Sequence, residues 1–153
     1  MKLSTHTFAS IVAILILCVG CNKEKEPLSP PIIDMWNCHH ESTWDESSTR
    51  EALIGEWEWE YIGCYSVPSN ANYEEFEGLE IEFKDDNTLD VIEDGQIIQT
   101  STWEVVDGDV DLFAVDVEPS VSQLYGRILF CEELVEFETS YIDGCDNYFR
   151  RKD

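Results

Sequence analysis

Basic residues are scarce in this sequence. It has nine Lys and Arg against 33 Asp and Glu, which gives a formal net charge of −24 at pH 7. A field of this sign repels the phosphates of nucleic acids and the headgroups of anionic lipids, so we expect neither to be bound directly. The simpler interpretation of the charge is that it keeps an exported protein soluble. The alternative is that it docks a basic partner.

Histidine, the side chain that acts most often as a general acid or base in enzymes, is also scarce. The chain has three histidines, and only His39 and His40 follow the N-terminal hydrophobic segment. A Ser–His catalytic pair therefore has only these two residues to draw on, and both precede the predicted β-strands; a free catalytic thiol is disfavoured if the cysteines form disulfides. No glycine-rich phosphate loop occurs, and the acids are too abundant for any catalytic pair to stand out. We therefore expect no enzymatic activity and no cofactor.

Two short segments contain metal-ligand residue types. Residues 38–41, Cys-His-His-Glu, place them side by side, whereas zinc sites use spaced pairs. A second set has the spacing of EF-hand ligands: Asp107, Asp109, Asp111 and Glu118. Leu112 stands where that loop needs glycine, and the alternation of Val110, Leu112 and Ala114 favours a strand whose aspartates face solvent. We expect no metal at either place.

Long hydrophobic runs are absent after Val19. The run from Phe8 to Val19 is too short to span a bilayer comfortably and, with one Lys before it, is typical of a signal peptide. Residues 18–21, Cys-Val-Gly-Cys, resemble the lipobox of bacterial lipoproteins, although Cys18 stands where that motif usually has Leu. The resemblance implies removal of residues 1–20 and lipidation of Cys21, which tethers the protein to a membrane without spanning it. Ordinary signal peptidase cleavage nearby is the alternative.

Residues 21–34 form the predicted lipidated tether. Charged residues at 23–26 are followed by Pro27, Pro30 and Pro31, a composition that favours extended chain. The thirteen residues 22–34 reach about 40 Å at ~3.1 Å each. Asn22 is not the Asp that retains lipoproteins in the inner membrane, and the segment resembles the export tethers of Bacteroidota lipoproteins. We expect an outer-membrane lipoprotein, on the periplasmic or the cell-surface face.

Residues 35–54 are predicted to contain one short helix. Ser48 and Glu51 have capping-box spacing, and Gly55 can end the last turn. Leu53 and its neighbours would then face the end of a barrel, and Trp36 and Trp44 could pack there too.

From Gly55 to residue 153 the hydrophobic period is two. Trp57, Trp59 and Tyr61 alternate with glutamates, which predicts a strand with one apolar and one acidic face. Similar short runs follow, separated by turn signals such as Asp94-Gly95 and Asp143-Gly144. About eight strands in sequence with short links predict an all-β, antiparallel up-and-down barrel.

The chain from Leu53 to Arg151 resembles the lipocalin-like domains of Bacteroidota lipoproteins. The resemblance is carried by residues 53–59, Leu-Ile-Gly-Glu-Trp-Glu-Trp, by residues 79–83, and by the closing residues 147–151. It implies that Gly55 and Trp57 open the first strand. It also implies that Arg150 or Arg151 packs across Trp57 at the closed end, a cation–π contact of about 0.5–2 kcal/mol.

Four cysteines remain after Cys18 and Cys21 are set aside, and an even number in an oxidising compartment suggests two disulfides. A meander barrel closes by pairing its last strand with its first, which would bring Cys64 near Cys145. Cys131 lies in a predicted turn at the opposite end, where Cys38 would enter. We favour Cys64–Cys145 and Cys38–Cys131 among the three possible pairings.

Aromatic side chains suggest two alternative functions. The candidates to line a ligand cavity are Trp59, Tyr61, Phe83, Trp103 and Phe113. An eight-stranded barrel has room either for its own side chains or for one small ligand. We predict binding of a small hydrophobic molecule, with residues 65–75 as a movable loop over the pocket. The alternative is a protein-interaction module whose barrel is filled.

Overall fold

The computed structural model describes residues 34–64 and 78–152. The predictions for the signal peptide, for Cys21, for the tether up to residue 33 and for residues 65–75 lie outside these residues. Among the described residues, no helix combines the length and the apolar character needed to cross a membrane.

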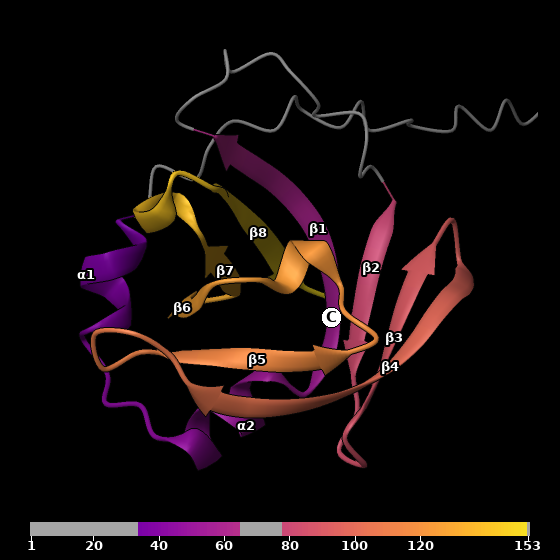
Figure 1. Cartoon of the computed structure of the whole chain (residues 1–153), viewed down its shortest axis with the longest axis horizontal. Coiled ribbons are helices and arrows are strands. Elements are labelled where there is room, and N and C mark those ends of the chain that lie inside the picture. The colour runs from indigo at the N-terminus through magenta and orange to yellow at the C-terminus, as the bar shows by residue number, and fades with distance from the viewer. Residues whose placement is uncertain (1–33, 65–77, 153) are drawn as a thin grey trace, which may run out of the picture.

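Eight antiparallel strands form a nearly closed barrel, which confirms the predicted fold class (Figure 1). The strands are β1 (Gly55–Cys64), β2 (Leu79–Phe83), β3 (Thr88–Glu93), β4 (Gln96–Asp107), β5 (Phe113–Glu118), β6 (Arg127–Cys131), β7 (Leu134–Glu138) and β8 (Cys145–Arg151). Their order in the sheet is β5-β4-β3-β2-β1-β8-β7-β6, so the first strand pairs with the last. The two ends of the sheet, β5 and β6, are not hydrogen-bonded to each other. We call the place where they meet the seam.

The barrel core forms where the period-two pattern puts apolar side chains on one face. Trp57 lies opposite Ile81 on β2, and Trp59 lies opposite Phe149 on β8; all four are buried in one cluster. The acidic residues between them point outward. The connection from β5 to β6 contains a short 3-10 helix, η1 (Ser122–Leu124), which buries Leu124 in the same core.

Within the described residues 34–54 there are two helices where one was predicted. The unexpected one is α1 (Met35–His39), whose N-cap Asp34 accepts the backbone N–H of Asn37 at 3.0 Å. The second, α2 (Glu46–Leu53), has Asp45 as its N-cap, and Ser48 occupies the third helical position. The predicted start at Ser48 was therefore wrong, because aspartate three residues earlier supplies the cap.

The end of α2 also differs from the prediction. Ile54 is the C-cap, and Gly55 already belongs to β1. Leu53 is fully buried against the barrel, and Trp44 packs against the same core, as predicted. Trp36 instead lies on α1 and is largely exposed.

The start of β5 was predicted too early. Val110 and Asp111 have φ of 54° and 63°, and the backbone N–H of Gly108 donates to Leu112 at 2.8 Å. These residues form the turn that leads from β4 to β5, so Val110 does not alternate with Ala114 in a strand. The inward residues of β5 are Val115 and Val117.

Two disulfides join the predicted pairs. Cys64–Cys145 links β1 to β8 at positions that are already cross-strand neighbours, with Cα atoms 4.3 Å apart. Cys38–Cys131 links α1 to the end of β6, with Cα atoms 5.5 Å apart. Both pairings of the sequence analysis are confirmed.

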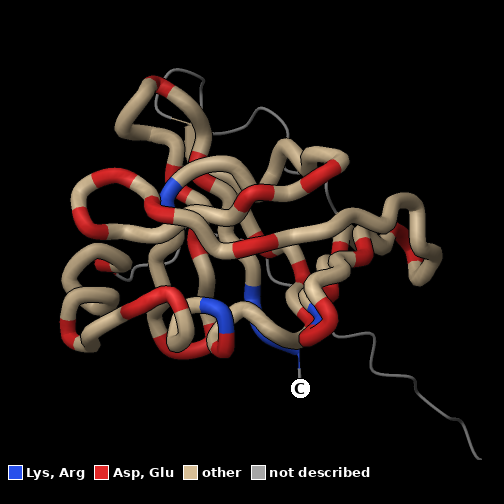
Figure 2. The backbone as a smooth tube through the Cα atoms, turned by 60° about the horizontal axis from the view of Figure 1, so that its bottom comes forward, with Lys and Arg blue, Asp and Glu red and all other residues tan. Residues whose placement is uncertain are grey.

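The barrel has two unlike walls. Strands β2 to β5 form what we call the open wall, whose outer face carries acids. Strands β6 to β8 form the covered wall, because α1 packs on their outer face over a second hydrophobic cluster: Met35, Leu112, Leu129, Cys131 and Leu134. Figure 2 shows acidic positions in many separate segments along the tube and basic positions at only a few places.

Candidate functional site

Three of the predicted pocket residues are packed inside the barrel. Trp59, Phe83 and Trp103 are no more than 3% exposed. The rings of Phe83 and Trp103 meet edge to face with centroids 5.0 Å apart, and the Trp103 indole N–H donates to the Thr88 carbonyl at 3.0 Å. The Trp59 indole N–H donates to the side chain of Asn147 at 3.3 Å. These aromatic rings therefore form core contacts with one another and with neighbouring strands.

The other two predicted pocket residues lie elsewhere. A β-bulge between Trp59 and Tyr61 shifts the register of β1 against β8. Tyr61 consequently lies opposite Tyr148, on the outer face, with ring centroids 5.7 Å apart. Alternation from Trp57 predicts Tyr61 to point inward, and the extra residue of the bulge reverses that direction. Phe113, at the start of β5, is half-buried against the main core.

The end of the barrel next to α2 has the contact that the lipocalin resemblance implies for a closed end. The Arg151 guanidinium lies over the Trp57 ring, 4.3 Å from its centroid, and donates to the carbonyls of Ala52 and Ile54. The Trp57 indole N–H donates to the Leu53 carbonyl at 2.7 Å. Gly55 has φ of 131°, and a Cβ there would lie 2.7 Å from Arg151. Of the two arginines left open, Arg151 therefore makes this contact.

Arg150 has a different role. It points to the outer face and pairs with Glu60 at 3.0 Å. The contacts of Gly55, Trp57 and Arg151 join the end of α2 to the first strand, β1, and the last strand, β8.

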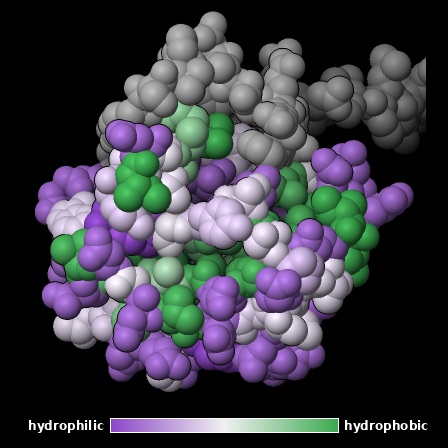
Figure 3. Space-filling view, viewed as in Figure 1, coloured by the Kyte–Doolittle hydropathy of each residue, from purple (hydrophilic) through white to green (hydrophobic). Residues whose placement is uncertain are grey.

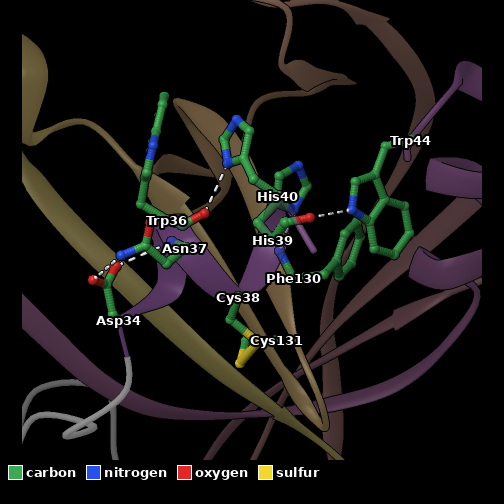
Figure 4. The surroundings of a disulfide bond; sticks show 9 residues. All are labelled: Asp34, Trp36, Asn37, Cys38, His39, His40, Trp44, Phe130 and Cys131. Atoms are coloured by element: carbon green, nitrogen blue, oxygen red, sulfur yellow. Dashed lines mark hydrogen bonds between the residues drawn. A yellow bond between two sulfur atoms is a disulfide. The ribbon is translucent and has the colours of Figure 1, made fainter. Parts of the chain in front are cut away.

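Helix α1 covers the free edge of β6 through His39 (Figure 4). The backbone N–H of Phe130 donates to Nδ1 of His39 at 2.9 Å, and the His39 ring stacks on Trp44 with centroids 5.3 Å apart. Burial, and then the charge of His40, lower the pKa of His39 to about 4. A neutral ring is what this acceptor position requires. Cys38 is in a disulfide, and Nδ1 of His39 accepts a backbone N–H of β6, so neither side chain is free to bind a metal.

A groove of about 350 Å³ lies along the seam. It is lined from the β4–β5 side by Val106, Gly108, Asp109, Ala114, Val115 and Asp116, and from the β6 side by Tyr125, Gly126, Arg127 and Tyr141. We call it the seam groove. On the face shown in Figure 3, hydrophobic residues occur in small groups separated by hydrophilic ones.

Arg127 organises the β6 side of this groove. Its guanidinium donates twice to Glu138, at 2.9 and 2.6 Å, and lies over the Tyr141 ring, 3.9 Å from the centroid. The ring of Trp36, on α1, also lies near this guanidinium, and its centroid is 5.8 Å from the guanidinium carbon. Arg127 itself is buried, whereas Tyr125, Tyr141 and Trp36 are 42–53% exposed.

Two buried carboxyls lie behind this cluster on the covered wall. Glu136 accepts the hydroxyl of Tyr148 at 2.7 Å, and burial raises its pKa to about 7. Burial also raises the pKa of Asp146, which accepts the backbone N–H groups of Thr139 and Ser140 at 2.8 and 2.7 Å. Those two bonds hold the 3-10 helix η2 (Ser140–Ile142), which carries Tyr141 into the groove.

The cluster of Arg127, Glu138 and Tyr141 beside the seam was not predicted from the sequence. Tyr141 and Arg127 stand in segments without a motif, and their approach depends on where the sheet ends. The one usable signal was the irregular stretch around Pro119, which interrupts the succession of strands at the seam.

The groups around the seam groove can make contacts with another molecule at the protein surface. Exposed aromatic rings, a positioned guanidinium and exposed acids can bind charged and aromatic groups of another molecule. Among the described residues, no three His, Cys, Asp or Glu side chains group closely enough to hold a metal ion. Comparison of the chain with protein-family models, with curated protein sequences and with solved structures gives no significant match.

Proposed function

We propose that the protein is a lipid-tethered, acidic β-barrel that binds another protein through the surface around its seam groove. The observation that carries this proposal is a contrast in exposure. The aromatic residues predicted to line an interior pocket, such as Trp59 and Trp103, are packed, whereas Tyr125, Tyr141 and Trp36 are exposed beside a groove.

The composition of the seam surface supports this proposal. Tyrosine, tryptophan and arginine are the residue types enriched at the energetic centres of protein interfaces. Ile142, 66% exposed, follows Tyr141 on the same short helix. Rings held by a buried arginine and a hydrogen-bonded turn lose little freedom on binding, which lowers the entropic cost of association.

The proposed function includes a lipid tether at the N-terminal side of the domain. Lipidation at Cys21 would place the domain at the outer membrane, and the described chain begins at Asp34, next to α1 and Trp36. The seam surface would then lie close to the point where the tether enters the domain. Replacing Cys21 with Ser should move the protein from the membrane to the soluble fraction, whereas a membrane-bound Cys21→Ser variant would contradict lipid anchoring there.

Binding of a small hydrophobic molecule inside the barrel is the second candidate. It is favoured by the eight-stranded architecture and by the Gly55, Trp57 and Arg151 contact at the closed end, which resemble ligand-binding lipocalin-like barrels. A ligand in the interior would be released as extra mass when the native protein is denatured.

Photocrosslinking in cells separates the two candidates. A photoreactive amino acid at position 125 should give a discrete protein adduct, and the same residue at Gln96, which is exposed at the other end of β4, should not. Equal adducts at both positions, or none at either, would contradict docking at the seam. Ligand mass released from the native protein in that case would favour the second candidate.

A further inference from the structure

The two sides of the seam groove differ in chemistry. Asp109 and Asp116, both exposed, line it from the β4–β5 side. Tyr125 and Tyr141, 53% and 44% exposed, line it from the β6 side. A group bound between them would meet carboxylates on one side and aromatic rings on the other.

The charge of the groove favours a cation. Arg127 is the one basic residue among those that line it, and Glu138 already neutralises that charge at 2.6 Å. Asp109 and Asp116 therefore leave the groove negative. Asp116 also lies opposite Glu104 across the β4–β5 pair, and Glu104 adds another negative charge nearby.

The groove already contains an example of how it can hold a guanidinium. Arg127 combines a carboxylate, that of Glu138, with the face of an aromatic ring, that of Tyr141. Tyr125 and Asp116 offer the same two kinds of group on the exposed part of the groove. A planar guanidinium can stack on a ring and bind a carboxylate with two parallel hydrogen bonds, whereas a lysine ammonium has no planar face and binds as a point charge.

We propose that the seam groove binds an arginine side chain of the partner protein, between the Asp116 carboxylate and the Tyr125 ring. This inference rests on the proposed function and specifies the partner's chemistry: an arginine in an exposed, basic segment. At about 350 Å³, the groove is at the small end of the range for ligand sites, which suits one side chain.

The test uses the purified protein in detergent micelles and three peptides, Gly-Gly-Xaa-Gly-Gly, with arginine, lysine or citrulline as the central residue. Citrulline keeps the shape of arginine without its charge. We expect the arginine peptide to shift the NMR signals of the Tyr125 and Tyr141 rings and to bind about tenfold more tightly than the citrulline peptide, with lysine between them. Binding should weaken as salt is added.

Substitutions locate the site. Asp116→Asn should weaken arginine binding about tenfold, and Tyr125→Ala about three- to fivefold, with Tyr125→Phe restoring it because the ring face remains. Glu93→Gln, which removes one exposed carboxylate from the β3–β4 hairpin, is the matched control and should leave binding unchanged.

Equal affinity for arginine and citrulline, or an Asp116→Asn effect no larger than that of Glu93→Gln, would overturn the inference. The peptide result is independent of the crosslinking result. Adducts at position 125 together with a failed peptide test would reject arginine recognition while leaving protein docking at the seam in place.

Discussion

The open wall and the covered wall differ in how many of their faces are buried. On β2 of the open wall, burial alternates along the strand, and the outward residues Glu80 and Glu82 remain partly exposed. On β6 of the covered wall, all five residues are buried, because the barrel core lies inside and α1 lies outside. One-sided burial leaves an alternating sequence, whereas two-sided burial leaves a nearly continuous run such as Ile128 to Cys131.

The two walls should also differ in their response to substitution. The outer face of the covered wall holds buried charges and a disulfide, so changes there remove contacts that water cannot replace. Apart from Asp90 of β3, which is buried and paired with Lys84, the outer face of the open wall meets solvent, where most substitutions have small effects.

Removing the Cys38–Cys131 disulfide should have the largest effect. The double substitution Cys38→Ser with Cys131→Ser opens a loop with a sequence separation of 93 residues and should lower the free energy of unfolding by about 3–5 kcal/mol in a urea titration. Hydrogen exchange should also become fast at the His40 amide, which is bonded to Trp36 in α1. Removing Cys64–Cys145 is the control, because it should leave that amide protected.

Arg127 should matter far more than Arg150. Arg127→Met leaves the nearly buried Glu138 without its partner and should cost about 2–4 kcal/mol of stability. Arg150→Met breaks a pair with Glu60 in which the arginine side chain is 50% exposed, and should cost less than about 1 kcal/mol. Equal losses in urea titrations would show that burial does not isolate the Arg127–Glu138 pair from water.

Glu136 should make stability depend on pH. Its pKa is raised from 4.5 to about 7, so the stability linked to its neutral form is fully present below pH 4.5 and is lost as the pH rises through 7. Glu136→Gln, which keeps an oxygen to accept the Tyr148 hydroxyl, should therefore be more stable than the wild type at pH 8, by about 1–3 kcal/mol, and similar at pH 4.5. Thermal unfolding of both proteins at several pH values measures this difference. A constant offset between them would contradict the assignment.

Glu104 of the open wall should give the smallest effect, a slight gain in stability when its charge is removed. It lies directly opposite Asp116, and removing one of two facing like charges by Glu104→Gln should stabilise the protein by about 0.2–0.5 kcal/mol. Glu93→Gln is the control, because Glu93 faces Leu79 and Gln96 across its strand pairs. The same gain in both variants would reflect net charge and not the facing pair.

The features that could be predicted from the sequence are those with a local pattern or a topological rule. Alternation around Trp57 and Trp59 indicated the first strand, and the pairing of last strand with first indicated Cys64–Cys145. The lipocalin resemblance indicated the contact across Trp57, although the choice of Arg151 over Arg150 depends on the register of β8.

The remaining features depend on tertiary contacts. A bulge of one residue moved Tyr61 to the outer face, and nothing in the alternation around it signals the extra residue. The seam groove depends on where two sheet edges stop, so Tyr125 and Arg127 gain their neighbours only in the folded chain. Asp146 similarly positions Tyr141 through a turn that has no recognisable motif.

The Cys38–Cys131 bond also decides how the fold bears mechanical load. A pull on the chain ahead of Met35 reaches β6 through a covalent bond at Cys38, after one short helix. The force then enters the covered wall directly and bypasses α2 and β1, which follow Cys38 in the chain. With the bond reduced, the same pull would unwind α1 and then load the α2 end of the barrel. In the proposed lipid-tethered protein, this disulfide would determine which part of the fold unfolds first.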